Sequence, residues 1–131
     1  MPFIIVKSKT SKLGRPDIHE IFWECVKNNC YRISDILDWY QIIYDEIDPS
    51  IEDEDKEFII QAANLLKNDI DLYTWKKWTK EIKKITNRSG KRLYLPLRKA
   101  LTGREDGPEM HALLPIIGSY KARKRLLGIK A

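Results

Sequence analysis

Apolar residues recur every three or four positions along most of this chain, which is the spacing of amphipathic α-helices. No stretch of alternating polar and apolar residues is long enough for a β-sheet, so we expect an all-α bundle of six or seven helices. The predicted helices cover about residues 17–28, 34–47, 54–68, 71–87, 96–103, 108–117 and 119–127.

Particular residues mark the ends and the buried sides of these helices. Asp17 and Glu20 are spaced as a capping box. Pro96 suits the first turn of a helix, whereas Pro115 should kink one. In the helix over 71–87 the spacing puts Leu72, Trp75, Thr79, Ile82 and Ile85 on the buried side. We therefore expect Trp75 in the core, and the pattern leaves Trp78 open.

The chain divides into an acidic and a basic part. Residues 1–70 contain 8 Lys/Arg and 14 Asp/Glu, a net charge of −6, whereas residues 71–131 contain 16 and 5, a net charge of +11. We expect an extended lead-in over 1–16, a first helical subdomain over 17–70 and a second, basic subdomain over 71–131. A basic half beside an acidic one indicates a face that binds a polyanion.

Composition excludes several classes of protein. No apolar run approaches the roughly 20 residues that span a bilayer, so we expect a cytoplasmic protein without a membrane partner. Cys25 and Cys30 lie five residues apart, which makes a disulfide on one helix unfavourable, so reduced thiols are expected. Together with His19 and His111 they do not show the spacing of a zinc site.

Basic and aromatic side chains alternate between residues 76 and 99, where ten Lys/Arg accompany a single acid. Lys and Arg neutralise phosphates, while aromatic rings stack on unpaired bases, so this pattern favours RNA as the ligand. The predicted contacts to the RNA backbone are Lys76, Lys77, Lys80, Lys83, Lys84, Lys91 and Arg92.

The acidic segment over residues 45–57 offers a different hypothesis. Its eight acids would suit a solvated loop and the start of a helix, where carboxylates interact favourably with the helix dipole. The alternative is an enzyme that uses Asp53 or Asp55 as part of a carboxylate pair, but no accompanying His or aromatic pocket supports it.

One block of sequence is more specific than any of these patterns. Pro96-Leu97-Arg98 is followed by Ala100-Leu101-Thr102-Gly103, then by Gly107-Pro108, Leu113-Leu114 and Gly118. This order and spacing resembles the PLR-x-ALTG block in the anticodon-binding region of bacterial glutamyl-tRNA synthetases. The resemblance is strongest over residues 88–127 and weaker over 17–85.

The resemblance implies a helical anticodon-binding fold and a role for particular residues. Arg32, with the aromatic Trp39 that follows it, matches the family segment whose arginine reads the third anticodon base. Arg98 and Met110 match contacts to the first base, and Gly107 and Pro108 lie by the central base. Some family members have Thr where this chain has Gly107, so a contact here must come from the backbone.

The resemblance also limits the function of this chain. The HIGH and KMSKS motifs of the catalytic part are absent, so we expect no catalytic residue and no cofactor here, with ATP and magnesium bound only by a catalytic domain. The expected partners are glutamate tRNA and the catalytic domain of the same parent chain, in a monomer. The alternative is a helical module that binds nucleic acid or protein without anticodon specificity.

Overall fold

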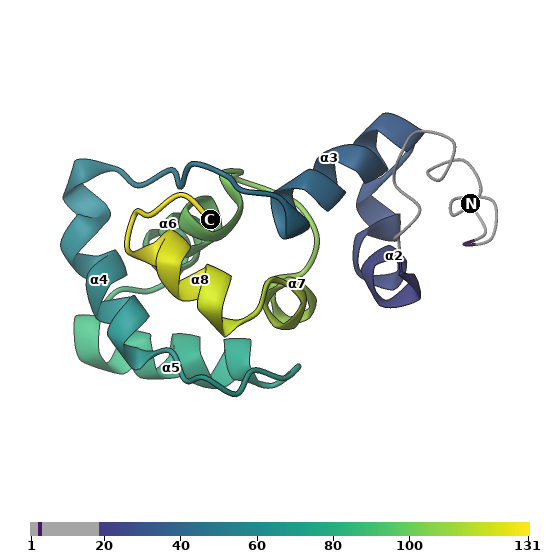
Figure 1. Cartoon of the computed structure of the whole chain (residues 1–131). Coiled ribbons are helices and arrows are strands. Elements are labelled where there is room, and N and C mark those ends of the chain that lie inside the picture. The colour runs from purple at the N-terminus through teal and green to yellow at the C-terminus, as the bar shows by residue number, and fades with distance from the viewer. Residues whose placement is uncertain (1–2, 4–18) are drawn as a thin grey trace.

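The computed structural model describes Phe3 and residues 19–131, and these residues form helices without a β-strand (Figure 1). The all-α class is therefore confirmed for the described part. The predicted lead-in over 1–16 and the cap at Asp17 lie outside the described residues. The α-helices are α2 (Glu20–Val26), α3 (Ile33–Tyr44), α4 (Lys56–Leu65), α5 (Thr74–Thr86), α6 (Lys91–Thr102), α7 (Met110–Ile117) and α8 (Ser119–Leu126). Two short 3-10 turns cover Lys27–Asn29 and Asp53–Asp55.

Helix α7 joins two groups of helices. It packs against α2 and α3 on one side and against α5 and α8 on the other. In Figure 1, α2 and α3 stand at the right, and α4, α5, α6 and α8 gather at the left. Helix α4 packs against α5, α6 and α8 although it precedes residue 70. The predicted subdomain boundary at that residue stays a prediction.

The core consists of the apolar face of each helix. Phe22, Ile36, Ile82, Leu97 and Leu113 are almost completely removed from solvent. Each such side chain stabilises the fold by about 1.5–3 kcal/mol relative to an exposed position. The helical spacing of these residues in the sequence thus accounts for the packed interior.

The sequence pattern placed Trp75 in the core and left Trp78 open, but the structure buries Trp78 more completely. Trp78 is 3% exposed, and its indole N–H donates to the carbonyl of Ala62 in α4 at 2.9 Å. Trp75 is only partly buried and stacks edge-on against Trp78. Because the two residues are three apart, both lie near one side of the helix, and the neighbouring α4 decides which one is covered.

Leu72 and Ile85, which the pattern placed on a buried side, are exposed, and so is Ile21, whose spacing with Phe22, Cys25 and Val26 also predicts a buried side. Ile21 is 74% exposed, Leu72 60% and Ile85 53%. Leu72 precedes α5, which begins only at Thr74. Ile21 and Leu72 instead line an open cavity of about 430 Å³ with Ala112 and Ile116 of α7.

Helix α6 begins at Lys91 rather than at Pro96, so the proline lies inside the helix. A proline there has no N–H for the carbonyl four residues earlier, which belongs to Arg92. The side chain of Arg88 donates to that carbonyl at 3.2 Å and pairs with Asp55 at 2.7 Å. A side-chain donor outside the helix therefore replaces the missing amide.

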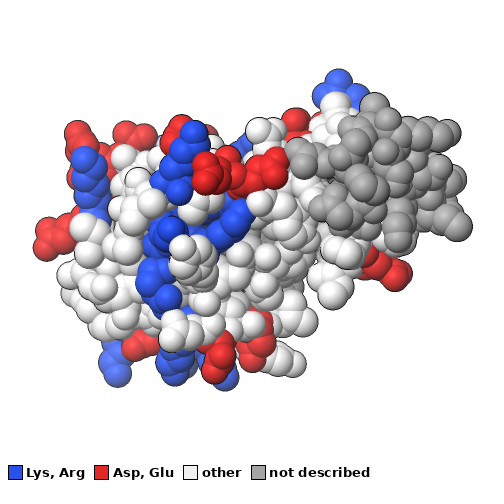
Figure 2. Space-filling view, viewed as in Figure 1, with Lys and Arg blue, Asp and Glu red and all other residues white. Residues whose placement is uncertain are grey.

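The basic residues of α8 hold the fold together. Arg125 is completely buried and donates to the carbonyls of Ala131, Leu101 and Asp45 at 2.9, 2.8 and 3.1 Å. Burial lowers the pKa of Arg125 to about 10, so the side chain stays charged near neutral pH. Lys121 and Arg123 likewise donate to carbonyls of the α3 end and of Leu66. In Figure 2 a blue band of Lys and Arg side chains runs left of the centre, in the region where Figure 1 shows α8.

Candidate nucleic-acid interface

Arg98 is held in place by the loop that follows its own helix. The side chain is half-buried on α6, and its Nη1 donates to the carbonyl of Pro108 at 3.0 Å. Burial lowers the pKa of Arg98, while the nearby carboxylates of Glu109 and Asp106 act in the opposite direction. Arginine remains protonated under such conditions, so Arg98 presents a fixed, charged fork with further donors at the surface.

The loop over residues 103–109 is packed onto Trp39 of α3. A Cβ at Gly107 would lie 2.3 and 2.5 Å from the ring atoms Cη2 and Cζ2 of Trp39, and 3.4 Å from Nη1 of Arg98. Gly107 also has a φ of +147°, a conformation that other residues rarely adopt. The loop can therefore approach the indole this closely only with glycine at position 107.

The start of α7 differs from the sequence prediction. The helix begins at Met110 rather than at Pro108, so Gly107 and Pro108 belong to the preceding loop. The group that Pro108 directs at Arg98 is a carbonyl acceptor, not one of the free N–H donors expected at a helix start. Pro108 is buried, and the Met110 side chain is 4% exposed. A base contact from Met110 remains a prediction and requires that this side chain be uncovered.

Arg32 stands at the beginning of α3 with 78% of its side chain exposed. Asp35 accepts the backbone N–H groups of Tyr31 and Arg32 at 3.0 Å each, and these bonds lower the pKa of Asp35. One carboxylate oxygen of Asp35 also lies 3.7 Å from Nη2 of Arg32. Arg32 is therefore the N-cap of α3, whose first residue, Ile33, lies one position before the predicted start at residue 34.

Trp39 connects the two arginines in space. Spacings of three and seven residues put Asp35 and Trp39 on the same side of α3 as Arg32. Arg32 then lies about 10 Å along the helix from Trp39, at a rise of about 1.5 Å per residue. Trp39 therefore brings α3, which begins beside Arg32, against the loop that holds Arg98, and neither guanidinium is buried in the core.

The lysines of α5 divide between two sides of the helix. All five predicted phosphate contacts there are exposed. Trp78 faces α4, whereas Trp75 faces Tyr94 of α6, with ring centroids 6.4 Å apart. At about 100° per residue, the α6 side of the helix carries three of the lysines. These are Lys76, Lys80 and Lys83.

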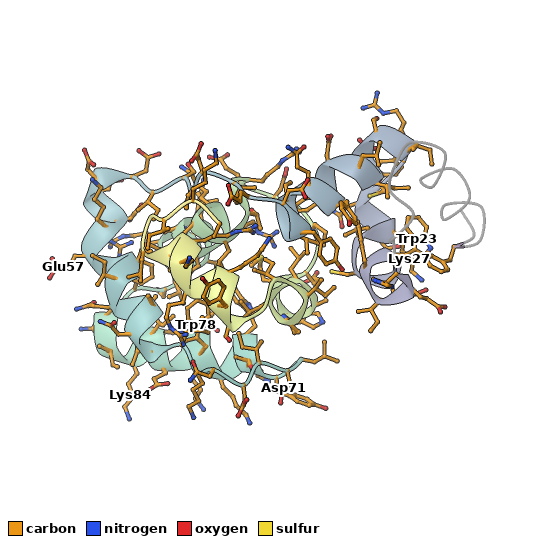
Figure 3. The ribbon with its side chains drawn as sticks, in the orientation of Figure 1. Trp23, Lys27, Glu57, Asp71, Trp78 and Lys84 are labelled. Atoms are coloured by element: carbon orange, nitrogen blue, oxygen red, sulfur yellow. The ribbon has the colours of Figure 1, made fainter. Side chains whose placement is uncertain are left out.

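The other two α5 lysines lie away from α6. Lys77 lines a small cavity of about 160 Å³ together with Leu65 of α4. Lys84 points outward at the lower edge of the molecule in Figure 3, away from the helices above it. A single RNA loop that contacts Arg98 reaches the Lys76 side of α5 more directly than it reaches these two.

Lys91 and Arg92 also differ in direction. Lys91 precedes Arg98 by seven residues, so the two side chains project from the same side of α6. Arg92 precedes Arg98 by six residues and lies about a third of a turn away. Both are exposed, and both line one cavity of about 410 Å³ together with Arg88 and Pro96. By helical spacing, Lys91 lies nearer to Arg98.

The acidic segment is occupied by ion pairs. Asp55 pairs with Arg88 at 2.7 Å, Asp53 with Lys56 at 3.0 Å, and Glu52 with Lys99 at 3.0 Å. Among the described residues, no group of three or more His, Cys, Asp or Glu could hold a metal ion. These contacts favour a structural role for the acids at the start of α4, and they give no support to a carboxylate active site.

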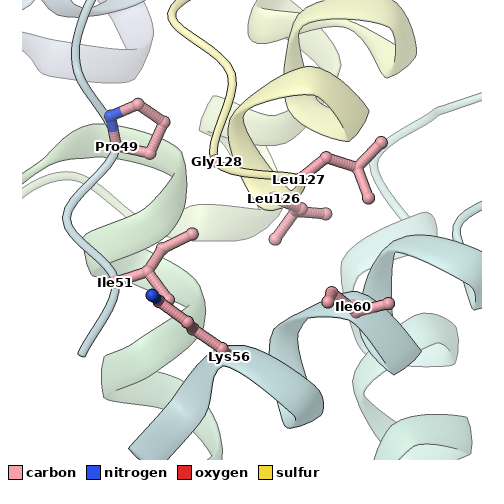
Figure 4. Close-up of a pocket in the computed structure, with 7 residues that line it drawn as sticks. All are labelled: Pro49, Ile51, Lys56, Ile60, Leu126, Leu127 and Gly128. Carbon is pink, nitrogen blue, oxygen red and sulfur yellow. The ribbon is translucent and has the colours of Figure 1, made fainter. Parts of the chain in front are cut away.

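One cavity lies away from the predicted RNA contacts. Figure 4 shows a cavity of about 440 Å³ between α4 and α8, lined by apolar side chains and by Lys56. None of the predicted RNA contacts lines it. In the part of the chain that the structure describes, no helix has the length and the apolar character needed to span a membrane.

Sequence reasoning missed one basic residue at the interface. The guanidinium of Arg104 lies over the Trp39 ring, 5.7 Å from its centroid. Trp39 entered the sequence analysis only as the aromatic residue of a family segment. Nothing in the sequence pairs it with a loop more than 60 residues away, so only the fold reveals this contact.

Comparison with known proteins decides the family. The model of the anticodon binding domain matches residues 2–129. The chain belongs to the anticodon-binding domain family. This domain is 41% identical over 127 residues to glutamate–tRNA ligase 2 of Hyphomonas neptunium, an alignment that covers 96% of the chain and 28% of the relative. It is 44% identical to glutamate–tRNA ligase 1 of Rickettsia prowazekii, over 98% of the chain and 29% of the relative.

The anticodon-binding domain therefore spans less than a third of the length of these relatives. A third, glutamate–tRNA ligase 2 of a Ruegeria species, is 43% identical over 94% of the chain and 28% of its own length. No solved structure matches this domain. The family assignment agrees with the resemblance that the PLR-x-ALTG block indicates.

Proposed function

We propose that this domain binds the anticodon loop of glutamate tRNA within a glutamate–tRNA ligase. The observation that carries the proposal is the contact between Trp39 and the loop that holds Arg98, because Trp39 lies on α3, the helix that Arg32 caps. Two guanidinium groups on elements that touch, held by different parts of the chain, suit two bases of one unstacked loop.

The surroundings of Arg98 favour a base over a phosphate. One of its N–H groups is bonded to Pro108, which fixes the plane of the guanidinium and leaves other donors free. Glu109 and Asp106 lie near enough to offset its positive charge. A neutral base edge is therefore a better partner than a second anion, and recognition of a base edge requires such a fixed geometry.

Phosphate contacts come from the basic sides of α5 and α6. Lys76, Lys80, Lys83 and Lys91 border the surface around Tyr94 and Arg98, and they would position the RNA backbone without reading its sequence. Lys77, Lys84 and Arg92 were predicted for the same role, but they project from other sides of their helices. We rank them below the first four as contacts to one anticodon loop.

The remaining functions belong to the parent protein. We infer a ligase in which a catalytic domain of the same chain binds ATP and magnesium and uses the tRNA that this domain selects. We expect that ligase to act as a monomer in the cytoplasm. The domain described here would supply selection of the tRNA and no step of the chemistry.

The proposal is tested by titrating the chain with a stem-loop RNA that carries the glutamate anticodon, and with versions changed at the first or third base. Arg98→Gln should weaken the cognate complex by about 1–3 kcal/mol and remove the preference at the first base, and Arg32→Gln should do the same at the third. Equal affinity of the unmodified chain for all three RNAs would contradict anticodon reading and favour a helical module without anticodon specificity.

A matched pair of lysine variants tests the backbone contacts. Lys80→Gln and Lys84→Gln remove the same charge from one helix, one on the side of α6 and one on the outer side. We expect Lys80→Gln to weaken every RNA alike and to reduce the slope of log affinity against log salt by about 1, with a smaller change for Lys84→Gln. The reverse order would show that the RNA follows a different side of α5.

A further inference from the structure

Arg104 is an exposed cation next to the proposed base-reading residue, and the family assignment gives it no role. Its neighbours in the loop are exposed, and in residues 19–131 no carboxylate lies within ion-pair distance of its guanidinium. Its guanidinium lies over the face of Trp39, 5.7 Å from the ring centroid. The donors at the edge of the guanidinium are therefore available to a ligand.

The backbone of Arg104 is fixed relative to Arg98. The hydroxyl of Thr102, which is 2% exposed, donates to the carbonyl of Arg98 at 2.8 Å and accepts the N–H of Arg104 at 3.0 Å. One buried side chain thus links the main chains of both arginines. A ligand bound by Arg98 finds Arg104 at a defined position beside it.

Trp39 supports the side chain without using its hydrogen-bond donors. A cation over an aromatic ring interacts through the ring face, so the N–H groups in the guanidinium plane stay free. Trp39 is part of α3 and is 5% exposed, and the loop over residues 103–109 packs against its ring. This arrangement limits the positions of a long side chain, which reduces the entropy lost when it binds.

We propose that Arg104 is a further RNA-binding residue, which donates to a backbone phosphate of the anticodon loop beside the base that Arg98 reads. This inference rests on the proposed function. A phosphate is the better partner for Arg104 because its guanidinium, unlike that of Arg98, is not fixed by a hydrogen bond to the protein. Such a guanidinium can adjust its position to a phosphate, but it lacks the rigid orientation that discrimination between base edges requires.

The charge around the loop makes this contact measurable. Glu105, Asp106 and Glu109 are exposed acids in the same loop. They offset the charges of Arg98, Lys99 and Arg104, so removal of Arg104 leaves the other five groups with a net charge of −1. Its removal should therefore have a larger effect on binding than the removal of an isolated surface cation.

The experiment compares Arg104→Gln with Lys67→Gln, which removes one exposed charge after α4, outside the proposed interface. Both are titrated with the cognate stem-loop and with the first- and third-base variants between 50 and 200 mM salt. We expect Arg104→Gln to weaken all three RNAs by about tenfold and to reduce the salt slope by about 1, with little change for Lys67→Gln. Arg104→Lys should retain the slope, because the charge remains. Thermal unfolding checks that the variants are folded.

The outcomes separate this inference from the proposed function. If Arg104→Gln behaves like Lys67→Gln while the unmodified chain still prefers the glutamate anticodon, the Arg104 contact is wrong and the proposed function stands. A loss that depends on one anticodon base overturns the phosphate assignment. If the unmodified chain shows no anticodon preference, the proposed function fails, whatever Arg104→Gln does.

Discussion

Replacement of Gly107 by alanine is the sharpest test of the packing between α3 and the loop over 103–109. The new Cβ would lie 2.3 Å from Cη2 and 2.5 Å from Cζ2 of Trp39, far inside van der Waals contact. The ring is 5% exposed and is covered by the loop and by Arg104, so it cannot move aside without opening the core. The backbone must also keep a φ of +147°, which disfavours any side chain.

The expected cost has two parts. A backbone conformation that is unfavourable for alanine costs about 1–3 kcal/mol, and one extra carbon in a packed core costs about 1–3 kcal/mol. Together they should reduce the free energy of unfolding by about 2–6 kcal/mol, which is a large share of the roughly 5–15 kcal/mol of a typical domain.

Gly103 supplies the matched control within the same loop. It has a φ of +74°, but a Cβ there meets no atom within 4 Å. Gly103→Ala should therefore cost only the backbone part, about 1–2 kcal/mol. Urea unfolding of both variants measures the difference through the shift of the midpoint. In a Trp39→Leu background the added cost of Gly107→Ala should fall toward that of Gly103→Ala.

Two results would refute this reasoning. Gly107→Ala that costs no more than Gly103→Ala would show that the loop does not rest on Trp39. An unchanged cost in the Trp39→Leu background would assign the whole effect to the backbone. The same variants can be titrated with RNA: displacement of the loop withdraws the carbonyl that holds Arg98, so preference at the first anticodon base should weaken in Gly107→Ala.

Further predictions concern groups away from the loop. Arg125→Ala leaves three backbone carbonyls without their donor and should cost about 3–5 kcal/mol in urea unfolding, against about 0.5 kcal/mol or less for the exposed Lys130→Ala; equal costs would contradict its structural role. Burial raises the pKa of Cys25 to about 11 and, with help from nearby carboxylates, that of Cys30 to about 12. Both thiols should therefore react with a disulfide reagent at pH 8 at least about tenfold more slowly than free cysteine, and a rate equal to the free thiol would show that they are not shielded. Asp35 has a lowered pKa, so its stabilisation is complete above the unfolded pKa of about 3.9 and is lost as the pH falls through the folded value. In Asp35→Asn the free energy of unfolding should depend less on pH below about pH 4. The same pH dependence as in the unmodified chain would show that Asp35 does not stabilise the start of α3.

Much of the fold follows from local spacing. The helical recurrence of apolar residues predicted the helices and the all-α class because each helix buries one side. It did not predict where α6 begins, since the rule that places proline in a first turn takes no account of a donor from elsewhere. Arg88 supplies that donor only because Asp55, far away in the sequence, holds it beside Pro96.

The interface was predictable in part. The family block identified Arg98, Gly107 and Pro108, and the structure brings these three together. The direction of each α5 lysine was not predictable, because the sequence shows that the lysines are exposed but not which neighbour lies on each side. Arg104 and its contact with Trp39 depend on two segments that meet only in the folded chain.

Helices α5 and α8 both carry several positive charges, but the lysines of α5 are exposed, whereas three basic residues of α8 donate to backbone carbonyls. A chain in which every arginine became lysine would have the same formal charge of +5. A lysine ammonium is a single point on a flexible stem and cannot reach the three separate oxygens that Arg125 joins. Such a chain would attract polyanions as before, but the final residue would lose its side-chain donor and would depend on its backbone hydrogen bonds with Ile47.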